Sequence, residues 1–378
     1  MDPTLGQDAA AIGDASAPTS DRDAAAADAW EPTPVSDGAV DSQGIADISE
    51  PKETPPSCQA GGDGLTNCGA SSESCCTSQE VPGGTYYRTY VNDGGGPTGE
   101  ADPTTVSSFR LDKYLVTVGR FRQYVDYLTG STGAPPADGS GKHTHLNGGL
   151  GLANSGSAGT YETGWDATDW NTYIATGPSA VNTWNVNLLF SWANGDPSWT
   201  STAGSQENLP LNSVNWYAAY AFCIWDGGFL PSEAEWEYAA AGGSQQREYP
   251  WGSTDPGTGT QYAIYGRYED DCIFPNNRLP GCAIFGTVLP VGTATLGAGY
   301  WGQLDMAGEV LEWNADFWID PYVEPCADCA YLVATSCCRI TRGGESGFPP
   351  SSLSPPFRSS WWPNQGALWI GFRCARTP

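Results

Sequence analysis

The sequence contains very few histidines. His143 and His145 are the only two among 378 residues, and they form one H-x-H in a glycine-rich stretch. Alternate residues on a strand can share a metal, but two ligands do not complete a site, so we expect a solvated loop there. The chain also shows no Ser/His/Asp triad, phosphate-binding loop or paired-carboxylate motif, which argues against the enzyme classes that depend on them.

Basic residues are scarce as well. Sixteen lysines and arginines oppose 43 aspartates and glutamates, which gives a net charge of −27. Such a surface repels phosphate backbones and anionic lipid headgroups, so neither nucleic acid nor an anionic membrane is an expected partner. The simplest interpretation of the negative charge is that it keeps the protein soluble. The alternative is that the acidic groups bind divalent cations.

Long apolar runs are missing too. No run approaches the roughly 20 residues of a membrane-spanning helix, so no transmembrane segment is expected. The opening MDPTLGQDAA has neither a basic flank nor an apolar core, so we do not interpret it as a signal peptide. Glycine (48), proline (29) and tryptophan (16) are abundant, which favours a loop-rich globular protein over a helical bundle.

Cysteine is plentiful by contrast. An even number in clusters is typical of a disulfide framework, so we expect an extracytoplasmic protein, secreted or tethered to the cell envelope. The twelve are Cys58, Cys68, Cys75, Cys76, Cys223, Cys272, Cys282, Cys326, Cys329, Cys337, Cys338 and Cys374.

Composition divides the chain into three parts. Residues 1–57 carry twelve acids and two bases and are expected to form a disordered acidic tether. Residues 58–80 hold four cysteines and predict a small cysteine knot with two disulfides, in which Cys75 and Cys76 each reach back to Cys58 or Cys68. A zinc site is the alternative there. Residues 81–378 are expected to form one domain.

Several segments of this domain have recognisable local patterns. TYYRTYV (85–91) and SSFRLDKYLVT (107–117) are expected to be extended. Residues 129–207 form an irregular insertion rich in glycine and tryptophan, whose aromatic rings either pack it internally or lie exposed for binding. The ninety residues from Tyr249 to Ile340 are expected to contain short strands and loops.

Three helices are predicted from their caps. Thr117 is a cap for apolar residues at helical spacing, and Asn215 caps WYAAYAFCIWD, whose inward face includes Trp216 and Cys223. Ser232 and Glu235 form a capping box for EAEWEYAAAGG, which ends on glycines.

Six ordered segments together resemble the formylglycine-generating enzyme family, also called sulfatase-modifying factors. They are LDKYLVTVGRFRQYV (111–125), NSVNWYAAYAFCIWDGGFLPSEAEWEYAAAGG (212–243), YPWG (249–252), WGQLDMAGEVLEWNADFW (301–318), ITRGG (340–344) and GFRCAR (371–376). The resemblance implies an α+β, C-type-lectin-like single domain, loop-rich with few helices and short strands. It also implies an oxidation of a sulfatase cysteine to formylglycine, using oxygen and copper(I) held by two cysteines.

The two cysteine positions of the family are changed here. Counted from Gly344 of the RGG segment, they fall on Phe348 and Leu353, and neither side chain can bind copper. Cys326 and Cys329 are expected to pair with Cys337 and Cys338 in a second knot rather than hold a metal. Copper is therefore not an expected cofactor.

The resemblance also implies structural features. The cysteine of the AFC helix pairs with that of the terminal GFRC, which here means Cys223 and Cys374. The positions of a second family disulfide read Ala240 and about Ser359, so that bridge is absent. Cys272 and Cys282 are expected to close a local loop.

Calcium is the other ligand that the resemblance implies. The segment GEVLEW places Gly308, Glu309, Val310 and Glu312 at one family site, where carbonyl and carboxylate oxygens suit a hard cation. The alternative is that Glu312 is a structural carboxylate. At a second family site Ile264 replaces the expected asparagine, which weakens that site.

These observations leave two main functions. The first is an exported, non-catalytic module that binds an unknown protein or glycan, and we prefer it because the thiol pair is missing. The second is a formylglycine-generating oxidase. A related iron-dependent sulfoxide synthase would need a histidine cluster, which the sequence lacks.

Overall fold

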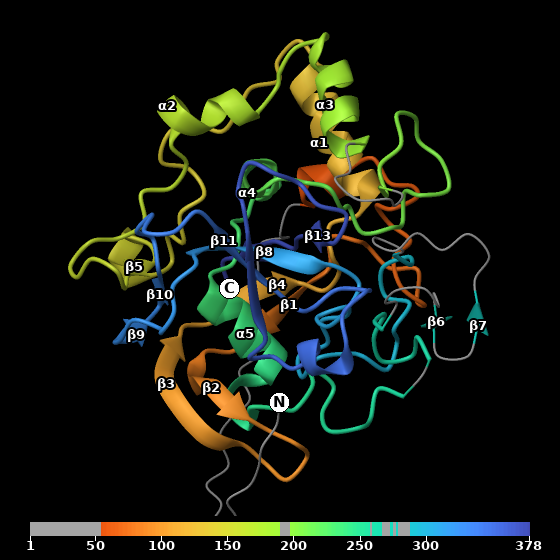
Figure 1. Ribbon diagram of the computed structural model, residues 1–378. Helices are drawn as coiled ribbons and strands as arrows, with labels where there is room; N and C mark the ends of the chain where they lie inside the picture. Colours follow the sequence, from red (N-terminus) through yellow and green to blue (C-terminus); the bar gives the residue numbers. More distant parts are fainter. Residues whose placement is uncertain (1–53, 190–196, 258, 267–272, 275–276, 279–287) are drawn as a thin grey trace, which may run out of the picture. The chain divides into compact units, whose positions relative to one another are not determined.

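The computed structural model describes residues 54–189, 197–257, 259–266, 273–274, 277–278 and 288–378, all within the compact unit Glu53–Pro378 (Figure 1). The predicted tether lies outside the described residues as far as position 53. Cys272 and Cys282, and so their predicted loop, also lie outside them.

Short helices and short strands alternate along the described residues, which confirms the α+β class. The α-helices are α1 (Val118–Thr129), α2 (Ala167–Trp170), α3 (Ala180–Leu189), α4 (Trp216–Trp225) and α5 (Glu233–Ala241). The strands are β1 (Ser78–Val81), β2 (Gly84–Val91), β3 (Thr98–Val106), β4 (Phe109–Asp112), β5 (Ala153–Asn154), β6 (Ile273–Phe274), β7 (Asn277–Arg278), β8 (Leu311–Phe317), β9 (Cys326–Ala327), β10 (Cys329–Ala330), β11 (Arg339–Arg342), β12 (Arg358–Trp361), β13 (Ile370–Gly371) and β14 (Ala375–Arg376). None of these helices has the length and apolarity that a bilayer span requires.

The predicted helix caps are all present. The Thr117 side chain accepts a hydrogen bond from the Arg120 amide at 3.1 Å, and Asn215 accepts from the Ala218 amide at 2.9 Å. Ser232 and Glu235 complete the capping box of α5. These oxygens satisfy amide groups that a helix leaves unpaired in its first turn, so each helix begins where the sequence predicts.

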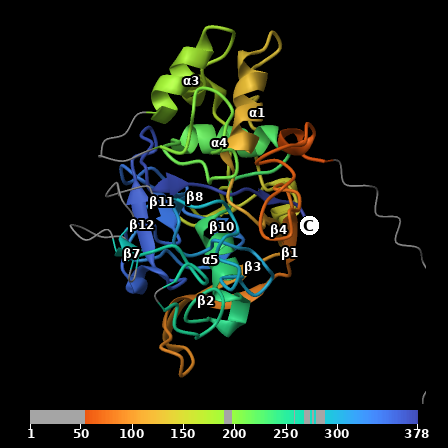
Figure 2. The same cartoon turned by 90° about the vertical axis from the view of Figure 1, so that its right-hand side faces the viewer.

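The strands form several small sheets. The largest has the order β12-β11-β8-β13, in which β11 is antiparallel to both neighbours and β13 is parallel to β8. Two three-stranded sheets have the orders β1-β4-β14 and β2-β3-β9. The helices α1, α3 and α4 lie at one end of the domain, and the β2–β3 hairpin lies at the opposite end (Figures 1 and 2).

The tryptophans of the insertion belong mainly to the core. Trp165, Trp184 and Trp199 are at most 2% exposed and pack with α1 and α4, while Trp170 is partly buried against them. The insertion is also less irregular than predicted, because residues 180–189 form α3. The exposed-aromatic alternative is therefore wrong for the three buried tryptophans.

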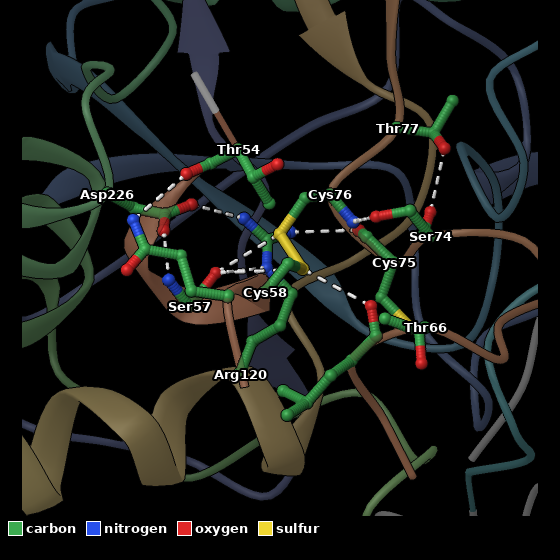
Figure 3. The surroundings of a disulfide bond; sticks show 12 residues. Thr54, Ser57, Cys58, Thr66, Ser74, Cys75, Cys76, Thr77, Arg120 and Asp226 are labelled. Carbon is green, nitrogen blue, oxygen red and sulfur yellow. Dashed lines mark hydrogen bonds and ion pairs between the residues drawn. A yellow bond between two sulfur atoms is a disulfide. The ribbon is translucent and has the colours of Figure 1, made fainter. Parts of the chain in front are cut away.

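The cysteine-rich segment packs directly on the domain. Cys58 pairs with Cys76 and Cys68 with Cys75, so each adjacent cysteine reaches back as predicted. The contacts with the domain include a residue before position 58, because Ser57 is fully buried and donates its amide to Asp226 at 2.9 Å (Figure 3).

Beside this segment lies a buried cluster of four charges. Arg120 contacts Asp112 at 2.9 Å and Asp226 at 2.6 Å, and Arg376 contacts the same carboxylates at 3.2 and 2.8 Å. All four side chains are at most 4% exposed. Burial alone would raise the pKa of Asp226, but the two arginines outweigh burial and lower it.

Replacing Asp226 with alanine should destabilise the domain strongly. The change leaves Arg120 and Arg376 with one carboxylate between them, which typically costs about 3–5 kcal/mol in a buried cluster. Unfolding by guanidinium chloride measures the loss, with the exposed Asp169→Ala as the matched control. Because the folded pKa of Asp226 is lowered, its contribution is present above the ordinary value of 3.8 and is lost as the pH falls further. Equal stability of the two variants at neutral pH would contradict this role.

Candidate functional site

The loop that follows β11 carries Phe348 and Leu353, the two residues that the resemblance predicts at the family's copper positions. It leaves the strand through Gly343 (φ 98°) and Gly344 (φ 69°), conformations that favour glycine. A Cβ at Gly344 would lie 2.8 Å from the Ser352 carbonyl oxygen, so the two sides of the loop approach closely only because no side chain is there. The Gly308 amide also donates to the Gly343 carbonyl at 2.7 Å, which fixes the exit from the strand.

Phe348 and Leu353, at the predicted copper positions, pack against apolar side chains. The ring of Phe348 packs edge-on against Phe357 with centroids 5.8 Å apart. Leu353 is 1% exposed and packs with Ala263, Tyr265 and Ala307. Neither side chain has a donor atom for a metal, and both pack against hydrocarbon groups.

An open groove of about 730 Å³ runs along the same loop. Its described lining consists of Gly266, Gly347, Phe348, Pro349, Pro350, Ser351, Ser352 and Phe357. The Gly266 amide donates to the Phe348 carbonyl at 2.9 Å and so holds one side of the groove in place. The lining is mostly apolar, which suits contact with another apolar surface better than proton or electron transfer.

Glu345 is the one carboxylate inside this loop. It is fully buried, accepts the Gly347 amide at 2.7 Å through Oε2, and has no hydrogen-bond partner at Oε1. Burial raises the pKa of Glu345 to about 7 and outweighs the hydrogen bond from Gly347. The side chain is therefore partly protonated at neutral pH.

The base of the loop is attached to α5 by buried ion pairs. Arg342 contacts Glu237 at 2.7 Å and Glu233 at 2.8 Å, and Arg358 contacts Glu233 at 2.6 Å. Burial raises the pKa of Glu237 to about 7, despite the opposing effect of Arg342. These contacts hold the end of β11 against the helix that the capping box begins.

The cysteine pairing differs from the prediction at one place. Cys223 and Cys374 form the expected bridge between α4 and the C-terminal segment. Cys326 pairs with Cys329, however, and Cys337 pairs with its neighbour Cys338, so the predicted cross-paired knot is wrong. The physical reason is that β9 pairs with β3 and β10 with β5, so the first two cysteines are held on other sheets and bridge locally.

These bridges also determine whether other cysteines could bind copper in place of the two family cysteines. All ten cysteines in the part of the chain that the structure describes are disulfide-bonded. A disulfide sulfur is not a thiolate, so none of the ten can replace the missing copper ligands.

The residues of the predicted calcium segment make other contacts. Both oxygens of Glu312 accept hydrogen bonds from Arg373, at 2.6 and 2.9 Å, and both side chains are fully buried. The Glu309 carboxylate accepts the Leu289 amide, and the Glu309 amide donates to the Ile264 carbonyl. Because Glu312 is paired with a guanidinium, these contacts do not by themselves favour calcium at Gly308, Glu309, Val310 and Glu312. Calcium binding stays a prediction.

The H-x-H stretch is not a solvated loop, and that expectation was wrong for His143. Its side chain is 1% exposed and lies between Glu162 and Glu235, with its ring nitrogens 3.1 and 3.2 Å from their oxygens. Burial would lower the pKa of His143, but the two glutamates outweigh it and raise the pKa to about 10. Within the described residues, no group of three His, Cys, Asp or Glu side chains is arranged to hold a metal ion.

Replacing Glu345 with glutamine should remove a pH-dependent loss of stability. The folded pKa is raised from 4.5 to about 7, so the wild-type chain loses stability as the pH rises through that interval. The stability of E345Q relative to wild type should therefore increase by about 1–3 kcal/mol between pH 4 and pH 8. Thermal unfolding across this range measures the difference, and the exposed Glu100→Gln is the control. A flat difference for E345Q would show that the carboxyl does not titrate in this range.

Comparisons with known proteins identify the family of this chain. A family model described as "Sulfatase-modifying factor enzyme 1-like domain" matches residues 69–378. The formylglycine-generating enzyme of Thermomonospora curvata is 27% identical over 333 residues, covering 79% of this chain and 92% of the relative. The inactive C-alpha-formylglycine-generating enzyme 2 of Mus musculus is 25% identical over 311 residues, covering 78% of this chain and 84% of the relative. Among solved structures, PvdO from Pseudomonas aeruginosa is 21% identical with a TM-score of 0.45, covering 79% of this chain and 93% of PvdO. The chain belongs to the sulfatase-modifying factor family.

Proposed function

We propose that this chain is an exported, non-catalytic binding protein built on the scaffold of the formylglycine-generating enzymes. The observation that carries the proposal is that Phe348 and Leu353 stand where the resemblance predicts the two copper-binding cysteines, with Leu353 buried among apolar neighbours. Copper(I) needs soft sulfur ligands, and neither side chain offers a donor atom.

Two further observations support this function. The ten described cysteines are all bridged, which is typical of proteins from oxidising compartments and leaves none of these sulfurs free for copper. The mouse relative is itself named inactive, so the family contains a member without the oxidase activity.

The alternative function is a formylglycine-generating oxidase acting on a cysteine of a sulfatase-type substrate. The likeness to the Thermomonospora curvata enzyme, which extends over 92% of that relative, favours it. It would require a copper site that uses neither of the two family positions.

An oxidase assay should separate the two functions. Purified protein, copper(I), oxygen and a Cys-x-Pro-x-Arg peptide should give no aldehyde by mass spectrometry, because Phe348 and Leu353 cannot bind copper. The double variant Phe348→Cys/Leu353→Cys restores sulfur at both positions and should bind copper(I) in a competition assay with a chromogenic chelator. The matched control, Phe348→Ser/Leu353→Ser, should not. Aldehyde formation by the wild-type chain would sink the non-catalytic proposal.

Alkylation without reductant should leave the intact mass of the full chain unchanged. The ten described cysteines are bridged, and the local loop predicted for Cys272 and Cys282 would remove the last two thiols. The same reaction after reduction and denaturation is the control and should label every cysteine. Two alkyl groups on the unreduced chain would contradict the predicted Cys272–Cys282 bridge and reopen the oxidase alternative.

A further inference from the structure

A second cavity lies at the other end of β11, away from the loop 343–353. Its volume is about 330 Å³, within the usual range for small-ligand sites. Aromatic side chains dominate its wall, and Arg339, the first residue of the strand, also lines it. The aromatic lining residues are Tyr161, Trp170, Trp216, Tyr217, Tyr220 and Phe317.

Arg339 is packed between aromatic rings, but not all of its hydrogen-bond donors have a partner. Its guanidinium carbon lies 3.9 Å from the ring centre of Trp216 and 3.5 Å from that of Phe317, so the planar group is sandwiched between two rings. The side chain is 5% exposed. One Nη donates to the carbonyl oxygen of Ala315, but Nε has no hydrogen-bond partner.

The other buried arginines show what is unusual here. Each has a carboxylate at 2.9 Å or less, whereas none of the described carboxylates forms an ion pair with Arg339. These other arginines are Arg88, Arg120, Arg342, Arg373 and Arg376. A buried charge without a partner is costly, so an arrangement of this kind favours a counter-charge from outside the domain.

The nearby acids are already engaged. Asp316 accepts amide hydrogen bonds from Glu233 and Tyr331, both at 2.7 Å, and burial raises its pKa to about 7. Glu162, on the cavity wall, is paired with His143. Burial lowers the pKa of Arg339 to about 9, and Tyr217 and Asp316 offset only part of that effect.

We propose that this cavity binds an organic anion, a carboxylate attached to an aromatic body. The carboxylate accepts hydrogen bonds from Arg339, whose fork of donors matches its geometry, and the aromatic body stacks within the ring-lined wall. The net charge of −27 does not prevent this, because a single anion within contact distance of a guanidinium is governed by that pair, while distant charges are screened.

The site is separate from the one that carries the proposed function. It uses no residue of the loop 343–353, so it stands whether or not that loop performs oxidation. The carboxylate could belong to a free aromatic acid or to the C-terminus of a peptide that ends in an aromatic residue. Both ligands present a carboxylate and an aromatic ring, and the test distinguishes the free acid from the peptide.

Titration calorimetry on the full chain tests the proposal. The probes are indole-3-acetate with its neutral amide, and a short peptide ending in tryptophan with a free or an amidated C-terminus. We expect at least one acid to bind roughly tenfold or more tightly than its amide, because a charge-assisted bidentate contact is lost in the amide. Binding of the free acid identifies a small-molecule site, whereas binding of the peptide alone identifies a chain terminus as the ligand.

Two test variants and one control variant keep the test independent of folding defects. Ala334 is exposed and lines the cavity, so Ala334→Trp should fill it and abolish binding while Arg339 stays in place. Leu296→Trp, at a half-exposed position outside the cavity lining, is the matched control and should bind like wild type. Arg339→Lys should weaken binding of the acid and leave the affinity for the amide unchanged. Equal binding of acid and amide, no effect of Ala334→Trp, or no binding of either acid would overturn the proposal.

Discussion

Four buried charges join parts of this chain that lie far apart in the sequence. Arg120 of α1 and Arg376 of β14 share the carboxylates of Asp112, at the end of β4, and Asp226, at the end of α4. Asp226 also accepts the Ser57 amide, which brings the cysteine-rich segment to the same cluster. Because the strands are short and of marginal stability individually, the loop-rich domain depends on long-range contacts of this kind.

The strand β11 has a similar organising role for the candidate sites. Its last residue, Arg342, is fully paired with acids of α5 and fixes the beginning of the loop that carries Phe348 and Leu353. Its first residue, Arg339, is packed between aromatic rings and lacks such a pair within the described residues. One short strand therefore separates the loop that carries Phe348 and Leu353 from a cavity that is lined by a buried arginine.

Local features of the fold were predictable because they depend on neighbours in the sequence. A cap requires an oxygen three residues before an amide, and Thr117, Asn215 and Ser232 meet that condition. The cysteine pairing was predictable only in part. The resemblance supplied Cys223 with Cys374, whereas the bridges Cys326–Cys329 and Cys337–Cys338 depend on which sheets hold those residues. His143 was misjudged because its two glutamate partners lie 19 and 92 residues away.

The family, the helix starts and the apolar side chains at positions 348 and 353 could be read from the sequence, because each follows from residue identity at a known spacing. Only the tertiary structure decided what surrounds those residues. It packed Leu353 into an apolar cluster, paired Glu312 with Arg373, and placed Arg339 beside a cavity while none of the described carboxylates forms an ion pair with it. The physical reason is that burial and ion pairing depend on contacts between distant segments, and a one-dimensional pattern does not specify those contacts.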